Sequence, residues 1–247
     1  MPKRLREYHR PTDLASALEL LRRPNTAPLL LGPRVPDHLY EEVEAVVDLS
    51  RLDLDYIRED EDGTLHIGAL TPLSVLADSD LIRSRANGLL AEAARVVAAS
   101  GLRDVATVGG ALLSQAGPPE VLLALDALQA LIVNDGPPPR PIFVEVKLPP
   151  LLARMGGALE RIARAPRDEA IVAVAAVVNG LTQRTRLCVG PFPIYGVSAN
   201  AEDVLQALAG WQPGSDFRAS AEYRQAMAGV LARRALETAR GRSMENH

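Results

Sequence analysis

The sequence contains a single cysteine, Cys188, among 247 residues. One thiol excludes a disulfide within the chain and an iron–sulfur cluster held by this chain alone. The four histidines are scattered, and none of their spacings is typical of a metal site. Nor does the sequence offer a Ser/His/Asp or Cys/His set for nucleophilic catalysis. We therefore expect neither metal ligands nor a catalytic acid, base or nucleophile in this chain.

Charge of one sign and long apolar runs are also lacking. The formal net charge is −4, and no long basic stripe indicates nucleic-acid binding. No apolar run reaches the length of a transmembrane helix, and the start Met1-Pro2-Lys3-Arg4 leads into charge and not into a signal-peptide core. The expected compartment is the cytoplasm. With 47% hydrophobic and 23% charged residues, the composition is typical of one large globular domain or two to three small ones.

The first fifty residues predict a compact α/β unit. A helix is expected over residues 12–23, with Thr12 as its N-cap and Pro24 preventing its continuation. The apolar run Leu29–Leu31 reads as a buried strand, and Val46–Leu49 as a second strand. The stretch 38–45 between them is expected to form a helix.

Residues 54–68 predict a β-hairpin that turns at Asp62-Gly63. His66 alternates with apolar neighbours, so we expect it on a solvated strand face. Thr71 followed by Pro72 predicts a helix N-cap. Further helices are expected over 89–99 and 119–129, and further strands over 130–133 and 142–146.

We interpret the proline-rich stretch 137–141 as a linker and the pair Gly156-Gly157 as a second break between secondary-structure elements. The sequence pattern changes after these two stretches. Beyond residue 159, two runs at 170–178 and 181–189 predict an antiparallel hairpin, and two helices are expected over 199–209 and 220–240. We therefore predict three parts: residues 1–52 and 53–155 as α/β subdomains and 156–242 as a C-terminal α+β domain.

One stretch, Thr107-Val108-Gly109-Gly110-Ala111, organises the whole chain. Two adjacent glycines after a β-branched residue allow positive φ and let a ligand approach the backbone N–H groups. Such a turn cradles a phosphate in many nucleotide-binding proteins, although a plain tight turn has the same sequence pattern. From the glycines alone, both interpretations stay open.

A family resemblance rests on motifs in a fixed order along nearly the whole chain: Tyr8-His9-Arg10-Pro11, Val47-Asp48-Leu49, Ile67-Gly68-Ala69-Leu70-Thr71, Thr107-Val108-Gly109-Gly110, the stretch 216–224 and Arg233-Arg234-Ala235-Leu236. With these motifs the chain resembles the FAD-binding medium subunit of the molybdenum hydroxylases, the group that includes carbon monoxide dehydrogenase and xanthine dehydrogenase. The resemblance implies two α/β subdomains that hold FAD between them, followed by a domain of antiparallel strands and helices. It also implies electron transfer from an iron–sulfur subunit and a molybdopterin-binding large subunit, through FAD, to an external acceptor.

The cofactor motifs match the family only in part. The family's first phosphate loop is Ala-Gly-Gly-Thr-Asp, and the matching residues here are Leu31-Gly32-Pro33-Arg34-Val35. Pro33 removes one backbone N–H donor, and Arg34 either meets pyrophosphate charge or is simply solvated. The second loop is Thr-Ile-Gly-Gly-Asn followed by an Asp, where this chain has Ala111 and then Glu120. The resemblance thus implies FAD contacts at Gly32, Pro33, Arg34, Thr107, Val108, Gly109, Gly110, Ala111 and Glu120.

Three functions are compatible with this sequence. The first is a working FAD-binding electron-transfer subunit, in which the cofactor carries the chemistry. The second is a degenerate, flavin-free subunit that keeps the fold as a scaffold for its partners. The third is a module that binds another small ligand in the same cleft. In every case function depends on the site and not on the fold alone.

Overall fold

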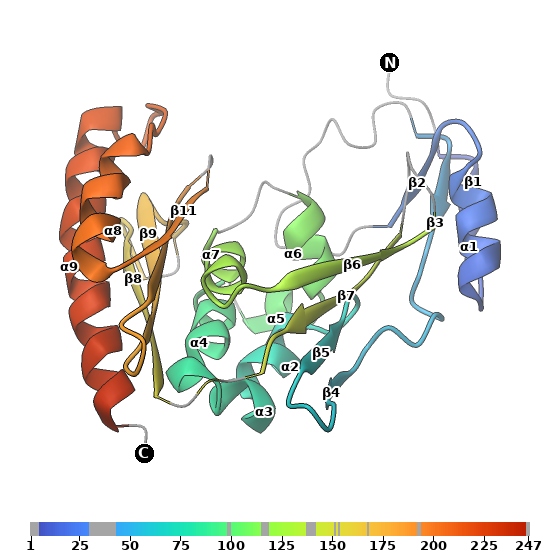
Figure 1. The fold of residues 1–247 in the computed structure, drawn as a ribbon. Helices are drawn as coiled ribbons and strands as arrows, with labels where there is room; N and C mark the ends of the chain where they lie inside the picture. Colours follow the sequence, from blue (N-terminus) through green and yellow to red (C-terminus); the bar gives the residue numbers. More distant parts are fainter. Residues whose placement is uncertain are drawn as a thin grey trace.

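Three β-sheets lie side by side in the computed structural model (Figure 1), which describes residues 5–29, 43–97, 100–114, 119–136, 142–150, 152, 154–166, 168–191 and 194–245. Each sheet is built from a different stretch of the sequence, and the third sheet begins at Met155. The fold is α+β: a parallel sheet first, then an antiparallel sheet with helices, then a second antiparallel sheet with helices.

The first sheet has three short parallel strands, β1 (Glu7–His9), β2 (Thr26–Pro28) and β3 (Ala45–Val47), in the order β1-β3-β2. Helix α1 (Leu14–Leu21) packs its buried residues against this sheet. Its N-cap is Asp13, whose carboxylate accepts the Ser16 N–H at 2.8 Å, so Thr12 as N-cap was wrong by one residue. Strand β2 ends at Pro28, one residue before the strand expected at Leu29–Leu31, and Leu30 and Leu31 lie outside the described residues. Most of the expected 38–45 helix falls outside the described residues.

The second sheet is antiparallel, with the order β4-β5-β7-β6, and it contains β4 (Ile57–Glu59), β5 (Leu65–Gly68), β6 (Leu131–Asp135) and β7 (Ile142–Leu148). The predicted hairpin is confirmed, because β4 pairs with β5 across a turn in which Gly63 has a φ of +82°. Only glycine adopts such a φ without strain.

His66 does not lie on a solvated face; it is 4% exposed, so that expectation was wrong. Its Nε2 lies 2.8 Å from Asp60 and its Nδ1 lies 3.1 Å from Glu145, which also accepts a hydrogen bond from Tyr56 at 2.8 Å. Strand alternation places His66 on the side of the sheet away from the apolar core. These polar side chains then cover it, which alternation does not reveal.

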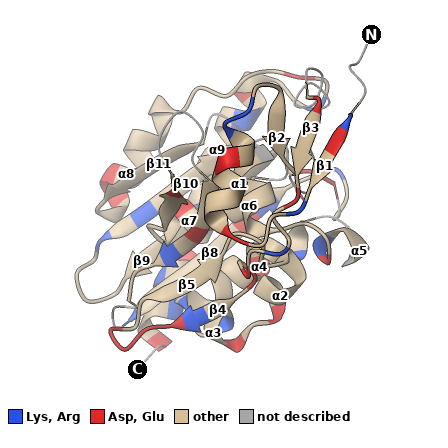
Figure 2. Cartoon of the chain, turned by 90° about the vertical axis from the view of Figure 1, so that its right-hand side faces the viewer, with Lys and Arg blue, Asp and Glu red and all other residues tan. Residues whose placement is uncertain are grey.

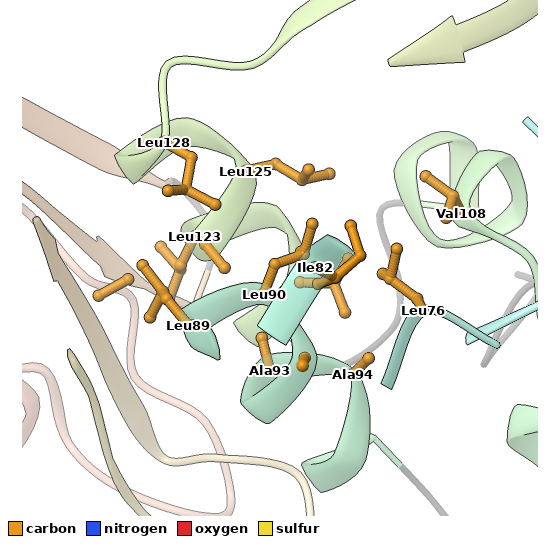
Figure 3. Close-up of a cluster of buried hydrophobic side chains, with 14 of the residues drawn as sticks. Leu76, Ile82, Leu89, Leu90, Ala93, Ala94, Val108, Leu123, Leu125 and Leu128 are labelled. Atoms are coloured by element: carbon orange, nitrogen blue, oxygen red, sulfur yellow. The ribbon is translucent and has the colours of Figure 1, made fainter. Parts of the chain in front are cut away.

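Helices cover the core-facing side of this sheet: α2 (Leu73–Asp78), α3 (Asp80–Arg83), the 3-10 turn η2 (Ala86–Gly88), α4 (Leu89–Val96), α5 (Ser100–Arg103), α6 (Val108–Ser114) and α7 (Glu120–Ala127). The predicted helices at 89–99 and 119–129 are confirmed as α4 and α7. Figure 3 shows their leucines meeting Leu76, Ile82 and Val108 in one apolar cluster. The N-cap of α2 is Pro72 and not Thr71, whose hydroxyl donates to the Tyr56 carbonyl.

The third sheet, with the order β11-β10-β9-β8, contains β8 (Met155–Ile162), β9 (Val172–Asn179), β10 (Thr185–Gly190) and β11 (Tyr195–Ala199). The β9–β10 hairpin is the predicted one. Helices α8 (Ala201–Ala207) and α9 (Ala221–Glu245) and the 3-10 turn η3 (Leu208–Gly210) follow the sheet, and α9 lies along its outer face (Figure 1). Gly156 and Gly157 do not break the chain but lie inside β8. A Cβ at Gly156 would collide with the Ala239 carbonyl of α9.

Helix α7 lies between the second and third sheets (Figure 1) and is fastened to the third sheet at both ends. At its first residue, Glu120 forms an ion pair with Arg161 of β8. Near its last residue, Asp126 accepts hydrogen bonds from Arg186 of β10 at its backbone oxygen and its carboxylate. Arg161 and Arg186 therefore each connect one end of α7 to the third sheet.

The charged residues in the described part of the chain are of both signs, as the small formal net charge of the sequence indicates. Lysines and arginines are interspersed with aspartates and glutamates in Figure 2. No helix in this part of the chain combines the length and the apolar character needed to cross a membrane.

Candidate functional site

The predicted glycine turn is the start of helix α6, with Thr107 immediately before it. The Thr107 hydroxyl accepts the Gly110 N–H at 3.0 Å, and the Thr107 carbonyl accepts the Ala111 N–H at 2.9 Å. This is the hydrogen-bond pattern of an N-cap, in which a side-chain oxygen takes a donor that the helix leaves without a partner. The sequence signature of a ligand loop is therefore also a capped helix start.

The first two N–H groups of α6 donate hydrogen bonds to the segment that follows β5. Val108 N–H donates to the Thr71 carbonyl at 3.0 Å, and Gly109 N–H donates to the Ala69 carbonyl at 2.7 Å. Together with Gly110, the first three donors of the helix thus have acceptors within the protein. An anion at this end would meet the partial positive charge of the helix, but it would have to compete for these N–H groups.

Gly109 is a packing glycine. Positive φ occurs among the described glycines only at Gly63, Gly88 and Gly136, so Gly109 does not adopt the positive φ that a glycine allows. A Cβ on Gly109 would lie 2.8 Å from the Ala69 carbonyl oxygen and 2.9 Å from the ring of Phe143. The absence of a side chain therefore lets α6 pack tightly against the second sheet.

The flanking residues of the turn face inward. Val108 is fully buried in the core cluster of Figure 3, and Ala111 is 6% exposed. A ligand at this helix start would therefore contact Val108 through its backbone only. Ala111 replaces the polar residue of the family loop with a methyl group, which offers no hydrogen bond.

Glu120, the first residue of α7, has a carboxylate that is completely buried. Its Oε1 lies 2.8 Å from Nε of Arg161, close enough for an ion pair. Apart from Arg161, neither Glu120 oxygen has a hydrogen-bond partner in another described residue. Burial raises the pKa of Glu120, and the positive charge of Arg161 limits this rise.

Arg161 is held in place by the loop that follows β8. Its Nη1 donates to the Pro166 carbonyl at 2.8 Å, and its Nη2 donates to the Asp168 carbonyl. Nearby, Glu169 raises the pKa of Glu120, while Glu169 itself pairs with Arg218 at 2.8 Å. Nothing in the sequence singled out Arg161, because its partner lies 41 residues away on another element.

The structure brings Thr107 to Ala111 together at one helix start and places Glu120 at the start of the next helix. The remaining predicted residues, Gly32, Pro33 and Arg34, lie outside the described residues. The described part of the site therefore contains the buried Glu120 carboxylate and the start of α6 with its two glycines.

A groove of about 1200 Å³ lies at the opposite end of α7, between that helix, β6 and the third sheet. Asp126, Leu131, Arg184 and Arg186 are among the residues that line it. None of the predicted site residues that the structure describes lines this groove. It therefore does not bear on the predicted cofactor site.

Comparisons with known proteins bear on the whole chain. Residues 3–138 match the family described as FAD binding domain in molybdopterin dehydrogenase. The chain is 29% identical to the carbon monoxide dehydrogenase medium chain of Hydrogenophaga pseudoflava, over 94% of this chain and 96% of that one. It is 33% identical to the nicotinate dehydrogenase FAD-subunit of Eubacterium barkeri, over 38% of this chain and 31% of that one. A solved structure of carbon monoxide dehydrogenase from Hydrogenophaga pseudoflava, which lacks the Mo-pyranopterin moiety of the molybdenum cofactor, contains a chain with the same fold. The two chains superimpose with a TM-score of 0.82 at 27% identity, over 98% of this chain and 99% of that one.

Proposed function

The chain belongs to the family of FAD-binding domains in molybdopterin dehydrogenases, and we propose that it is the FAD-binding, electron-transferring subunit of such a dehydrogenase. FAD supplies the redox chemistry when bound, since it accepts and releases electrons that no side chain of this protein can carry. The chain itself binds the cofactor, orients it and excludes water. The single cysteine supports this division of labour, because iron–sulfur clusters must then be held by another subunit.

The observation that carries the proposal is the buried carboxylate of Glu120. Apart from Arg161, its two oxygens have no hydrogen-bond partner among the described residues, and burying such a group without further partners is costly. Ribose and ribityl hydroxyl groups are donors that would satisfy those oxygens. We assign Glu120 to that role, and we assign Thr107, Val108, Gly109, Gly110 and Ala111 to close backbone approach. Gly32, Pro33 and Arg34 complete the proposed site from the first α/β part.

The proposed partners are an iron–sulfur subunit and a molybdopterin-binding large subunit. The relatives that support them are named as a medium chain and as an FAD-subunit, which are words for parts of larger complexes. We further propose a cytoplasmic location and the division into residues 1–52, 53–155 and 156–242. Separation of the three sheets along the sequence supports that division.

A second candidate is a flavin-free scaffold subunit of the same kind of complex. It is favoured by the first three N–H groups of α6, which already have acceptors within the protein. Pro33 removes a further donor from the other loop. If both loops lack free donors, the pyrophosphate loses the hydrogen bonds that hold it in place.

Titrating the purified chain with FAD separates the two candidates. We expect a bound-flavin absorption band and a dissociation constant weaker than an intact pair of loops would give. One or two lost hydrogen bonds to a charged group, at about 1.5–3 kcal/mol each, weaken binding by roughly tenfold to several thousandfold. The triple variant Pro33→Gly, Arg34→Thr, Val35→Asp should therefore bind FAD more tightly, and Gly110→Val should abolish binding. No bound flavin in either the natural chain or the folded triple variant would establish the scaffold.

Purification from the native host tests the partners. We expect the chain to co-purify with one subunit that carries iron–sulfur clusters and one that carries molybdopterin. A lone monomer from gently lysed cells would contradict both candidates.

A further inference from the structure

We propose that Arg161 is a positioning residue of the FAD site: it keeps the Glu120 carboxylate ionised and turned so that its free oxygens accept the cofactor's hydroxyl groups. This inference rests on the proposed function and extends it. Arg161 lies in β8, outside residues 3–138 that match the FAD-binding family. The cofactor site would thus depend on a residue of the C-terminal part.

The contacts of Arg161 are those of a fixed cation. Its two Nη groups donate to carbonyls of its own loop, which leaves Nε to face the Glu120 Oε1 at 2.8 Å. Because the guanidinium is anchored on its far side, it stays beside Glu120 whether or not a ligand is present. It neutralises the charge of the carboxylate without occupying both of its oxygens.

The charges around Glu120 explain why a cation is needed there. Burial disfavours the ionised form of Glu120, and Glu169 disfavours it further. Arg218 pairs with Glu169 and weakens that repulsion, but Arg161 is the cation in contact with Glu120. Removing Arg161 would raise the pKa of Glu120 further and favour its protonated form, which would weaken the charge-assisted hydrogen bonds to cofactor hydroxyls.

A purely structural role is the competing explanation, since Arg161 also fastens α7 to the third sheet. Arg186 provides the matched comparison. It fastens the other end of the same helix, donating to Asp126 through Nε at 2.7 Å and to Ser198 at 2.8 Å. A variant at Arg186 also removes contacts between α7 and the third sheet, but it leaves the cation beside Glu120 in place.

The experiment measures FAD affinity by quenching of flavin fluorescence between pH 6 and pH 8. The variants are Arg161→Met, Arg161→Lys, Glu120→Gln, the Arg161→Met/Glu120→Gln double variant and Arg186→Met. We expect Arg161→Met to weaken FAD binding by about ten- to a hundredfold at pH 6. The affinity of this variant should then increase as the pH rises and Glu120 ionises. Arg161→Lys should restore part of the affinity. Glu120→Gln should be weak at every pH, and the double variant should be no weaker.

Arg186→Met should keep the natural affinity and a flat pH profile. Equal losses in Arg161→Met and Arg186→Met, or a loss that does not change with pH and adds to that of Glu120→Gln, would overturn the positioning role. If Arg161→Met does not fold, Arg161→Lys and the double variant carry the same comparison. A natural chain that binds no FAD refutes the proposed function itself, and with it this role. Natural affinity in a folded Arg161→Met refutes the positioning role alone.

Discussion

Replacing Gly109 with alanine tests whether the glycine turn is held by packing within the protein. A Cβ at this position would lie 2.8 Å from the Ala69 carbonyl oxygen and 2.9 Å from Phe143 Cδ1. Both distances are shorter than carbon tolerates, and the first neighbour is backbone, which cannot rotate away. Moving α6 outward would also weaken the 2.7 Å hydrogen bond from Gly109 N–H to that carbonyl.

The magnitude follows from three effects. Overpacking a close contact costs about 1–3 kcal/mol, and a weakened backbone hydrogen bond costs roughly a further 0.5–1.5 kcal/mol. Alanine gains about 1 kcal/mol over glycine in a helix. We therefore expect Gly109→Ala to lower the free energy of unfolding by about 0.5–3.5 kcal/mol and to lower Tm by several degrees.

Urea unfolding, followed by circular dichroism, measures the effect, and Gly229→Ala in α9 is the control. Gly229 also lies in a helix, but a Cβ there would have no neighbour within 4 Å. The control should therefore be as stable as the natural chain or up to about 1 kcal/mol more stable. If Gly109→Ala matches the control, the close contact to Ala69 does not constrain this glycine, and a ligand role becomes the better explanation for it.

Two further predictions concern titratable groups. The hydrogen bond from Arg224, at 2.6 Å, holds the pKa of Asp216 well below its usual range. A carboxyl with a depressed pKa contributes stability that is fully present above the unfolded pKa of about 3.9 and is lost progressively as the pH falls from there through the folded pKa. Asp216→Asn should therefore lower the urea midpoint at pH 7 and lower it less at about pH 3, and an equal loss at both would refute the assignment. Burial, followed by the neighbouring Asp126, raises the pKa of the Cys188 thiol. We expect a thiol reagent to label Cys188 only as fast as the chain opens, and labelling within seconds in the native chain would contradict its buried placement.

Periodicity in the sequence predicted the elements whose burial follows a simple pattern. The hairpins β4–β5 and β9–β10 and the helices α4, α7, α8 and α9 were confirmed, because each alternates or repeats its apolar residues in the way its sheet or core requires. Element ends were less accurate. Thr12 and Asp13 are both good N-caps, and only the geometry shows that Asp13 accepts the hydrogen bond.

The errors share a different cause, which is contact with residues far away in the sequence. His66 alternates as a surface residue does, yet Glu145, 79 residues later, covers it. Gly156 resembles a break, yet it makes room for the Ala239 carbonyl on α9. Arg161 has no local motif, and its importance is apparent only beside Glu120. A local pattern contains no record of such partners.

The same distinction decides which residues are evidence for a cofactor. Thr107 and Gly109 have sufficient structural reasons to be what they are, since one caps a helix and the other makes room for a carbonyl. Their retention would be expected in a flavin-free scaffold as well. Glu120 is different, because packing alone favours an apolar side chain at a fully buried position over a carboxylate with unmet oxygens. We therefore propose that variants at Glu120 test flavin binding more directly than variants at Gly109, because the packing of α6 already explains that glycine.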